Sequence, residues 1–297
     1  MARKIRVATI SLAYELRKAS NRQDNYEYMR KCFAEIAPLK PDLVCLPEVW
    51  PMYGLAEHIA PCPEDMTVMR ELARKHRTYV VGSIHEKRKN GLYNTAPIIG
   101  RDGKILGRYD KIHPVETELE MGIVSGRKDQ RPVKTDIGTI GVQICFDVNW
   151  PQESEFLADQ GTEILVFSSA FPAGTILTAL ATLYQYYIIP AIWTYDSGII
   201  DNTGRWIAKT DRLMWWVCRE INLDRTVFHW DFQDHRLKDI RKKYGNKVKI
   251  EVFGPEGWFV LEPEGDLSIE TVKKEFGLVT YREYIKRATG KQDKARP

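Results

Sequence analysis

Two kinds of connection between strand-like runs limit the folds that are open to this chain. Some apolar runs, such as residues 5–12, are followed by a helical period, as over residues 25–36. Others are joined to a second strand-like run by tight turns, which fall at residues 102–103, 136–138 and 202–204. Strand–helix units form parallel pairs, whereas hairpins form antiparallel pairs. A chain that mixes the two predicts an α/β fold with two packed sheets and helices outside them.

The C-terminal part of the chain differs from the rest. A core of strand and helix patterns is nearly complete by residue 223, and residues 224–297 are rich in charged and aromatic side chains. Helices are expected there at 235–244 and 269–276. Its aromatic side chains are expected to pack against another surface, either of the same chain or of a second copy. They are Phe228, Trp230, Phe232, Phe253, Trp258 and Phe259. We expect residues 1–297 to form one domain with an extension that helps to build an oligomer.

Composition and charge exclude several classes of protein. The formal net charge is +4 with both signs interspersed, which is too mild to indicate binding to nucleic acid. No run of about 18 apolar residues occurs, so no association with a membrane is expected. The N-terminal segment predicts a first strand rather than a signal peptide. Five irregularly spaced cysteines indicate free thiols in a reducing compartment, and hence a cytoplasmic protein.

Cys145 stands where an apolar strand gives way to a helix. Residues 139–145 have strand character, and Trp150 and Pro151 open the next helical pattern. A sharp strand-to-helix turn exposes the side chain at its apex and leaves main-chain N–H groups free to bind an oxyanion. The position therefore favours a nucleophile, although a buried structural cysteine is the more common role of this residue.

Glu48 and Lys111 also follow strand-like runs. Glu48 comes directly after an apolar strand, where burial would make its carboxylate a stronger base that can accept a thiol proton. The alternative is a glutamate in a surface loop. Lys111 ends another strand, where its ammonium could stabilise negative charge on a carbonyl oxygen or simply remain in solvent.

His113 is the alternative partner for the cysteine, because Cys–His pairs are the more common thiol chemistry. It lies two residues after Lys111, and the spacing leaves a Cys145–His113 dyad open. A metal site is not expected, because the chain has no Cys-x2-Cys pair and zinc needs three or four ligands. The remaining cysteines are predicted to be structural; they are Cys32, Cys45, Cys62 and Cys218.

The three strand-end residues lie in segments that resemble the signature segments of the nitrilase superfamily of carbon–nitrogen hydrolases. They occur in the same order, first the glutamate, then the lysine and then the cysteine. The matching segments are residues 46–48 (LPE), 94–96 (NTA) with 102–103 (DG), 109–114 (YDKIHP), 141–147 (GVQICFD) and 150–151 (WP). The resemblance runs from about residue 7 to residue 223.

This resemblance implies a four-layer αββα sandwich that pairs with a second copy, as a homodimer or a larger homo-oligomer. It implies Cys145 as the nucleophile, Glu48 as the base and Lys111 as the oxyanion stabiliser, with His113 reduced to a loop or supporting role. The family often uses a second glutamate between the lysine and the cysteine. Glu118 is preferred here, because its distance from Gly126 is closer to the family's pattern, and Glu120 is the alternative. The family's chemistry requires no metal and no organic cofactor.

The chain departs from the family where substrates are selected. Residues 179–185 (ALATLYQ) lack an arginine and a Glu-Asn pair that many members carry in the helix after the cysteine. Val148 and Asn149 stand where carbamoyl-amino-acid hydrolases of the family bind a carboxylate with arginines. We therefore expect a neutral, aromatic substrate pocket, lined by Phe146, Asn149, Trp150, Phe171, Trp193 and Tyr195.

The predicted function is hydrolysis of a small amide or carbamoyl compound through a cysteine thioester, which releases ammonia or an amine. One alternative is a nitrilase that uses the same residues on a nitrile. An alternative of another class is a catalytically idle binding or regulatory protein of the same fold. The presence of Glu48, Lys111 and Cys145 argues against the idle protein.

Overall fold

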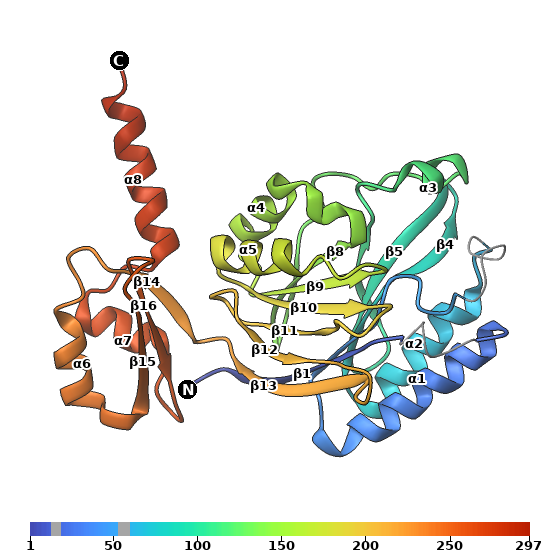
Figure 1. Ribbon diagram of the computed structural model, residues 1–297, viewed down its shortest axis with the longest axis horizontal. Coiled ribbons are helices and arrows are strands. Elements are labelled where there is room, and N and C mark those ends of the chain that lie inside the picture. The colour runs from blue at the N-terminus through green and yellow to red at the C-terminus, as the bar shows by residue number, and fades with distance from the viewer. Residues whose placement is uncertain (13–18, 53–59) are drawn as a thin grey trace. The chain divides into compact units, whose positions relative to one another are not determined.

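The computed structural model describes residues 1–12, 19–52 and 60–297. Within these residues the chain forms two compact units (Figure 1). The larger unit holds residues 6–220, and the smaller unit holds residues 1–5 together with 221–297.

The first sheet of the larger unit combines parallel and antiparallel pairs. Its strands run in the order β13 (Trp216–Asn222), β1 (Lys4–Ile10), β2 (Leu43–Cys45), β3 (Tyr79–Val81), β5 (Gly91–Ile99) and β4 (Ile84–Arg88), with β6 (Ile105–Asp110) also on β5. β1, β2 and β3 are parallel, as expected for strands linked by helices. β5 pairs antiparallel with β3, β4 and β6, and the β5–β6 hairpin turns at the predicted Asp-Gly pair.

The second sheet has the same mixed character. Its order is β12 (Trp206–Lys209), β11 (Gly198–Ile200), β10 (Tyr187–Ile192), β9 (Ile164–Ser169), β8 (Gly138–Ile144) and β7 (Val133–Thr135). The three central strands β8, β9 and β10 are parallel, so their carboxyl ends lie along one edge. In this register Ile144 lies opposite Ser168, and Ser169 lies opposite Ile192.

Helices cover the outer face of each sheet (Figure 1). α1 (Arg22–Ile36), followed by the short helix η1 (Ala37–Leu39), packs with α2 (Pro63–His76) on the first sheet. α4 (Pro151–Asp159) and α5 (Gly174–Tyr184) pack on the second sheet. The larger unit is therefore a four-layer α–β–β–α sandwich, and this prediction is confirmed. α5 ends at Tyr184, because Gln185 adopts a left-handed conformation and β10 begins at Tyr187.

Local sequence signals mark where α1 and α4 begin. The Asn21 side chain accepts a hydrogen bond from the Asp24 main chain at the start of α1, and Asp24 returns the interaction in a capping box. α1 then buries Tyr26, Met29 and Phe33, which recur at helical spacing against the first sheet. α4 begins with Pro151, whose missing N–H costs nothing at the first helical position.

Buried hydroxyl groups join the two sheets close to Glu48. Ser168 on β9 donates through Oγ to the main-chain oxygen of Leu46 at 2.9 Å and accepts from the main-chain N–H of Ser83 at 3.1 Å. Ser83 Oγ accepts in turn from the main-chain N–H of Val49 at 2.8 Å. Each bond satisfies a main-chain group that is shielded from water. The segment that carries Glu48 is thereby fixed to the strand beside the one that leads to Cys145.

The smaller unit contains an antiparallel sheet that the sequence reasoning did not predict. Its strands run in the order β14 (Thr226–His229), β16 (Trp258–Pro263) and β15 (Val248–Phe253). The predicted helices are present as α6 (Arg236–Tyr244) and α7 (Ile269–Phe276), and η3 (Gly245–Lys247) leads into β15. Charged residues such as Lys249 and Glu251 interrupt the apolar residues of β15, which is why its strand character was missed.

Three of the six aromatic residues noted in the extension are buried inside this smaller unit. Phe228 and Phe259 stack with ring centroids 5.4 Å apart beneath α6 and α7. Trp258 packs against Tyr281, the first residue of the last helix, α8 (Tyr281–Ala295). These rings are covered by their own chain, whereas the Phe232 side chain remains 87% exposed.

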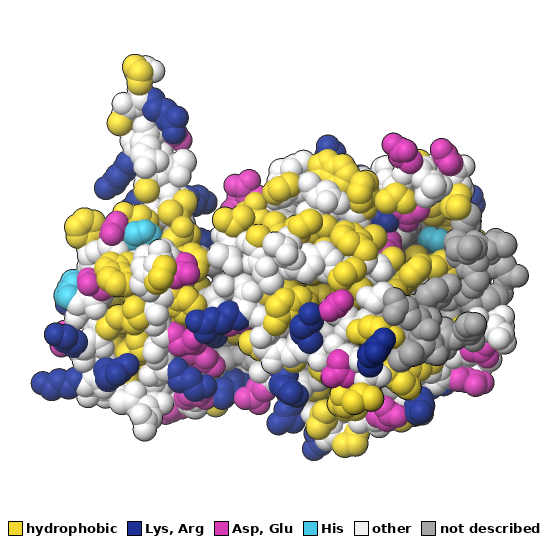
Figure 2. All heavy atoms as spheres, viewed as in Figure 1, with side chains coloured by type: hydrophobic (Ala, Val, Ile, Leu, Met, Phe, Trp, Pro, Cys, Tyr) yellow, Lys and Arg dark blue, Asp and Glu magenta, His cyan; other side chains and the backbone are white. Residues whose placement is uncertain are grey.

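The last helix has a polar surface. None of its residues is buried, and lysine and arginine side chains lie along it (Figure 2). In the described part of the chain, no helix has the length and apolar character needed to cross a membrane.

Candidate active site

The three predicted catalytic residues meet between the carboxyl ends of strands from both sheets. Glu48 follows β2 and Lys111 follows β6 in the first sheet, and Cys145 follows β8 in the second. The Lys111 Nζ atom lies 2.8 Å from Glu48 Oε1. Glu48, Lys111 and Cys145 are exposed by only 4%, 2% and 9%, so their charges interact in a largely dry site.

Cys145 occupies a sharp turn at the end of its strand. β8 ends at Ile144, one residue earlier than predicted, and a 3₁₀ helix, η2 (Cys145–Asn149), begins with the cysteine itself. Cys145 has φ of +49°, a left-handed value that is uncommon for residues other than glycine. This conformation costs about 1–3 kcal/mol, so the surrounding structure must hold it in place. The turn places the thiol close enough to Glu48 for the charge of this carboxylate to act on it.

The Cys145 thiol is protonated in the resting protein. Burial raises its pKa to about 12, and the Glu48 carboxylate adds to this effect, while Lys111 opposes it. A thiol in this environment is a weak nucleophile until a base removes its proton, because the thiolate is the reactive form. Glu48 lies in the right place to act as that base.

Lys111 remains charged although it is buried. Burial lowers the pKa of its ammonium, but Glu48, Cys145 and Glu118 together raise it further, so that the net pKa is above the ordinary value. Two of its three N–H groups are taken by Glu48 Oε1 and by Glu118 Oε2, the latter at 2.6 Å. One N–H is left with which Lys111 can bind a substrate oxygen.

Of the two candidate second glutamates, the structure places Glu118 against Lys111 and leaves Glu120 exposed. Both belong to the short helix α3 (Glu116–Glu120). Glu118 Oε2 also accepts from the main-chain N–H of Val115 at 2.8 Å, which holds the carboxylate at the start of this helix.

Asp147 joins the cysteine turn to the lysine loop, a role that the sequence reasoning missed. Its carboxylate accepts from the main-chain N–H groups of Ile144 at 3.0 Å and His113 at 2.8 Å, and from the Tyr109 hydroxyl at 2.9 Å. Burial raises the pKa of Asp147 to about 7, and the hydrogen bonds from the three donors oppose this rise. Its position two residues after Cys145 was the available signal, because a side chain there can reach back to cap the turn.

His113 is held by other partners. Its ring stacks on Trp150 with centroids 3.8 Å apart, and its Nε2 atom lies 3.2 Å from the buried carboxylate of Glu153. The groups whose charges act on the thiol are instead Glu48 and Lys111. This arrangement favours a supporting role for His113 over a Cys–His dyad.

Three of the predicted substrate-binding residues lie on the turn after Cys145. Phe146 is 37% exposed and packs edge-to-face on the half-buried ring of Trp150. Asn149 is exposed, and its side chain donates to the main-chain oxygen of Phe146 at 3.0 Å.

The other three predicted substrate-binding residues follow β9 and β10. The Trp193 indole donates to the main-chain oxygen of Glu48, so this residue helps to hold Glu48 in place. Phe171 packs edge-to-face on Phe167, and the main-chain oxygen of Tyr195 accepts from the Thr210 hydroxyl. All three are partly buried.

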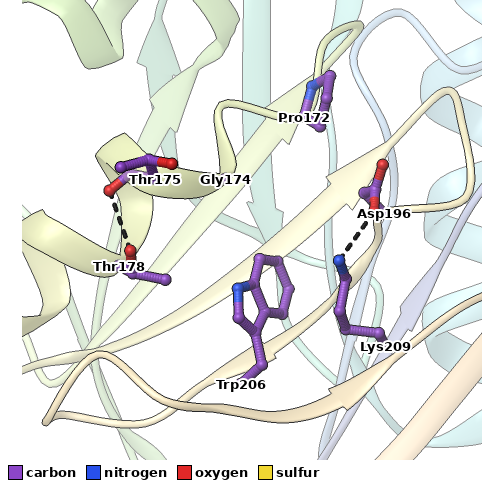
Figure 3. Close-up of a pocket in the computed structure, with 7 residues that line it drawn as sticks. All are labelled: Pro172, Gly174, Thr175, Thr178, Asp196, Trp206 and Lys209. Atoms are coloured by element: carbon purple, nitrogen blue, oxygen red, sulfur yellow. Dashed lines mark hydrogen bonds and ion pairs between the residues drawn. The ribbon is translucent and has the colours of Figure 1, made fainter.

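A surface pocket of about 410 Å³ opens beyond the carboxyl ends of β9 and β10 (Figure 3). The six predicted substrate-binding residues do not line it. Its walls are formed by Pro172, Gly174, Thr175, Thr178, Asp196, Trp206 and Lys209. Lys209 pairs with Asp196 at 2.9 Å and lies over the Trp206 ring, so the charges of this pocket are already matched.

The described residues contain no group of three or more His, Cys, Asp or Glu side chains arranged to hold a metal ion.

Comparison with known proteins gives a consistent result. The family model described as carbon-nitrogen hydrolase matches residues 6–228. A nitrilase and fragile histidine triad fusion protein of Caenorhabditis elegans is 28% identical over 270 residues, covering 78% of this chain and 61% of the relative. The chloroplastic omega-amidase of Arabidopsis thaliana is 28% identical over 211 residues, covering 62% of this chain and 57% of the relative. The chain thus spans about three fifths of the length of these relatives.

Solved structures share the fold. The crystal structure of a carbon–nitrogen hydrolase from Helicobacter pylori has a TM-score of 0.66 at 21% identity, covering 82% of this chain and 93% of that one. At this level of identity the likeness concerns the fold alone.

The pKa of Asp147 predicts a pH dependence of stability. The folded protein keeps a proton on this carboxyl up to about pH 7, whereas the unfolded chain releases it near the ordinary value of 3.8. The free energy of unfolding should therefore fall as the pH rises through this window, by up to about 1.4 kcal/mol per pH unit from this group. Asp147→Asn should lack this contribution. Urea unfolding of both proteins between about pH 5 and 7 measures the difference, and parallel pH profiles would contradict the expectation.

Proposed function

Because the chain belongs to the carbon–nitrogen hydrolase family, we propose that it hydrolyses a non-peptide carbon–nitrogen bond of a small amide or carbamoyl compound. The observation that carries this proposal is the buried Cys145 thiol, on which the charges of Glu48 and Lys111 act, with Lys111 2.8 Å from the Glu48 carboxylate. The omega-amidase among the relatives supports an amide as the substrate.

In the first half of the reaction, Glu48 removes the thiol proton as Cys145 Sγ attacks the substrate's carbonyl carbon. Glu48 Oε1 already accepts from Lys111 and Asn94, whereas Oε2 accepts only the main-chain N–H of Ala170 at 3.0 Å. A lone pair on Oε2 is therefore the one available for the proton. The C–N bond then breaks, and the leaving ammonia or amine takes this proton from Glu48.

Negative charge on the carbonyl oxygen is stabilised from two directions. Lys111 offers its remaining N–H, and Glu118 holds the ammonium in place from the other side. The main-chain N–H of Phe146 lies in the first turn of η2, where amide groups have no partner within the helix. Both donors are fixed before the substrate arrives, so little reorganisation is needed in the transition state.

In the second half, water hydrolyses the thioester. Glu48, again ionised, accepts a proton from the water as its oxygen attacks the thioester carbon. The C–S bond breaks, Glu48 returns the proton to sulfur, and a carboxylic acid leaves. The resting thiol, with its pKa of about 12, is thereby restored.

We further propose that the protein acts in the cytoplasm as a homodimer or larger homo-oligomer. All five cysteines are free, which suits a reducing compartment. α5 (GTILTALATLY) carries no charged residue, and its Leu183 and Ile176 side chains are 62% and 38% exposed. An uncharged helix with exposed apolar side chains suits burial against a second copy.

Leu183→Lys should lower the sedimentation mass, whereas Leu213→Lys, at an 88% exposed site, should not. An unchanged mass in Leu183→Lys would refute this interface.

Cys145→Ala should abolish hydrolysis without unfolding the protein, because it removes the nucleophile and only a small buried group. Activity against a panel of amides, carbamoyl compounds and nitriles measures the first effect, and circular dichroism measures the second. Iodoacetamide should modify Cys145 faster than the other four thiols. Turnover by the alanine variant, or a Cys145 no more reactive than Cys45, would favour an idle binding protein.

Lys111→Ala should lower kcat by at least about 10²-fold, the usual effect of removing one oxyanion donor. His113→Ala should lower it much less, because its ring contacts Glu153 and Trp150. Steady-state kinetics on a shared substrate gives the ranking, and the reverse order would favour a Cys–His enzyme.

A neutral amide should be preferred to an N-carbamoyl amino acid of matched size. A substrate carboxylate is best bound by a bidentate arginine close to the nucleophile, and Val148 and Asn149 follow Cys145 instead. Arg127, in the loop before the turn, is paired with Asp129 at 2.5 Å. The kcat/KM values of the two substrates, with a nitrile as a third arm, test this proposal. A preference of about tenfold or more for the acid, worth about 1.4 kcal/mol, would overturn it.

A further inference from the structure

A buried asparagine completes a ring of hydrogen bonds around the catalytic lysine. The Asn94 side chain on β5 is only 1% exposed, and its Nδ2 atom donates to Glu48 Oε1 at 2.8 Å and to Glu118 Oε1 at 3.0 Å. Lys111 Nζ donates to the same two carboxylates. Two donors therefore alternate with two acceptors in a closed ring.

The carbonyl oxygen of the Asn94 amide indicates the role of this residue. Among the described residues, no hydrogen-bond donor reaches the buried Oδ1 atom of Asn94. An unsatisfied buried carbonyl costs about 1–3 kcal/mol. Rotating the amide would not remove this cost, since it would point Oδ1 at two carboxylates. The arrangement is thus explained by what the NH₂ group does for Glu48 and Glu118.

Asn94 adds donors without adding charge. One ammonium faces two carboxylates here, and a second cation in its place would compete with Lys111 for them. An amide N–H favours the ionised form of a carboxylate that accepts it while leaving the net charge unchanged. The shared Nδ2 atom also fixes the spacing between the two glutamates on either side of Lys111.

We propose that Asn94 is a positioning residue for the hydrolysis, which keeps Glu48 and Glu118 ionised and spaced so that Lys111 is shared between them. This inference rests on the proposed function of the same site. It assigns to Asn94 no contact with the reacting atoms; the amide acts through the two glutamates.

The groups that titrate around Asn94 come from several elements. They are Glu48 after β2, Lys111 after β6, Glu118 on α3, Cys145 after β8, and His85, which lies directly opposite Asn94 on β4. Because histidine titrates near neutrality, its contribution must be separated from that of the glutamates. The comparison is therefore made in the natural sequence and again in a His85→Gln background.

The test is the pH dependence of two rates in the full chain: kcat for an amide, and alkylation of Cys145 by iodoacetamide, followed site by site by mass spectrometry. In Asn94→Ala the acidic midpoint of both profiles should move to higher pH by about half a unit or more, because the carboxylates have lost a donor. Asn94→Asp preserves the shape of the side chain and adds a third carboxyl, so its shift should be larger. Asn222→Ala removes a comparably buried amide that donates to the Pro263 oxygen in the smaller unit, and its midpoint should not move.

An unshifted midpoint in folded Asn94→Ala or Asn94→Asp would overturn the inference, and so would an equal loss of rate at every pH. If Asn94→Ala does not fold, Asn94→Asp decides the matter. The alkylation profile needs no substrate. A natural-sequence protein that hydrolyses no compound in the panel would therefore refute the proposed function, while the profile still tests the role of Asn94.

Discussion

The charge cluster around Lys111 is the interaction on which the rest of the site depends. An ammonium and two carboxylates lie between the two sheets, and removing such ions from water costs several kcal/mol each. This cost is offset only when every charge keeps close partners. Lys111 lies within 2.8 Å of Glu48 and 2.6 Å of Glu118, and Asn94 and the main chain of Ala170 supply further donors. The removal of one member would leave its partners charged and unmatched.

The cluster can act on the Cys145 thiol only if the two sheets keep their spacing. Glu48 and Lys111 belong to one sheet and Cys145 to the other, so any slip between the sheets would separate the base from the thiol. Two buried side chains resist such a slip. Ser168 binds the strand end that precedes Glu48, and Asp147 binds both the turn of Cys145 and the loop after Lys111. Both act on main-chain groups, which fixes the backbone itself.

A buried thiol next to a carboxylate explains why this arrangement suits covalent chemistry. Burial keeps the proton on Cys145, and the same dry environment strengthens the attraction between Lys111 and a developing oxyanion. In the proposed mechanism the thiol is activated only when Glu48 removes its proton in the course of attack. The left-handed backbone at Cys145 contributes to this arrangement. In a regular strand the side chain would instead follow the alternation of β8 from one face of the sheet to the other.

The sequence by itself determined the four-layer fold and the positions of Glu48, Lys111 and Cys145. Strand ends, hairpin turns and helix starts are encoded locally, in apolar spacing, Asp-Gly pairs and prolines, so they can be recognised without the fold. Contacts between distant segments are not encoded in this way. The sequence preferred Glu118 to Glu120 only by its spacing, and only the tertiary structure brought Glu118 into contact with Lys111, because this depends on which side of a five-residue helix faces the lysine. It likewise revealed Asn94 and Asp147, whose partners lie up to 46 residues away in the chain, and the sheet of the smaller unit, whose charged strands hide their alternation.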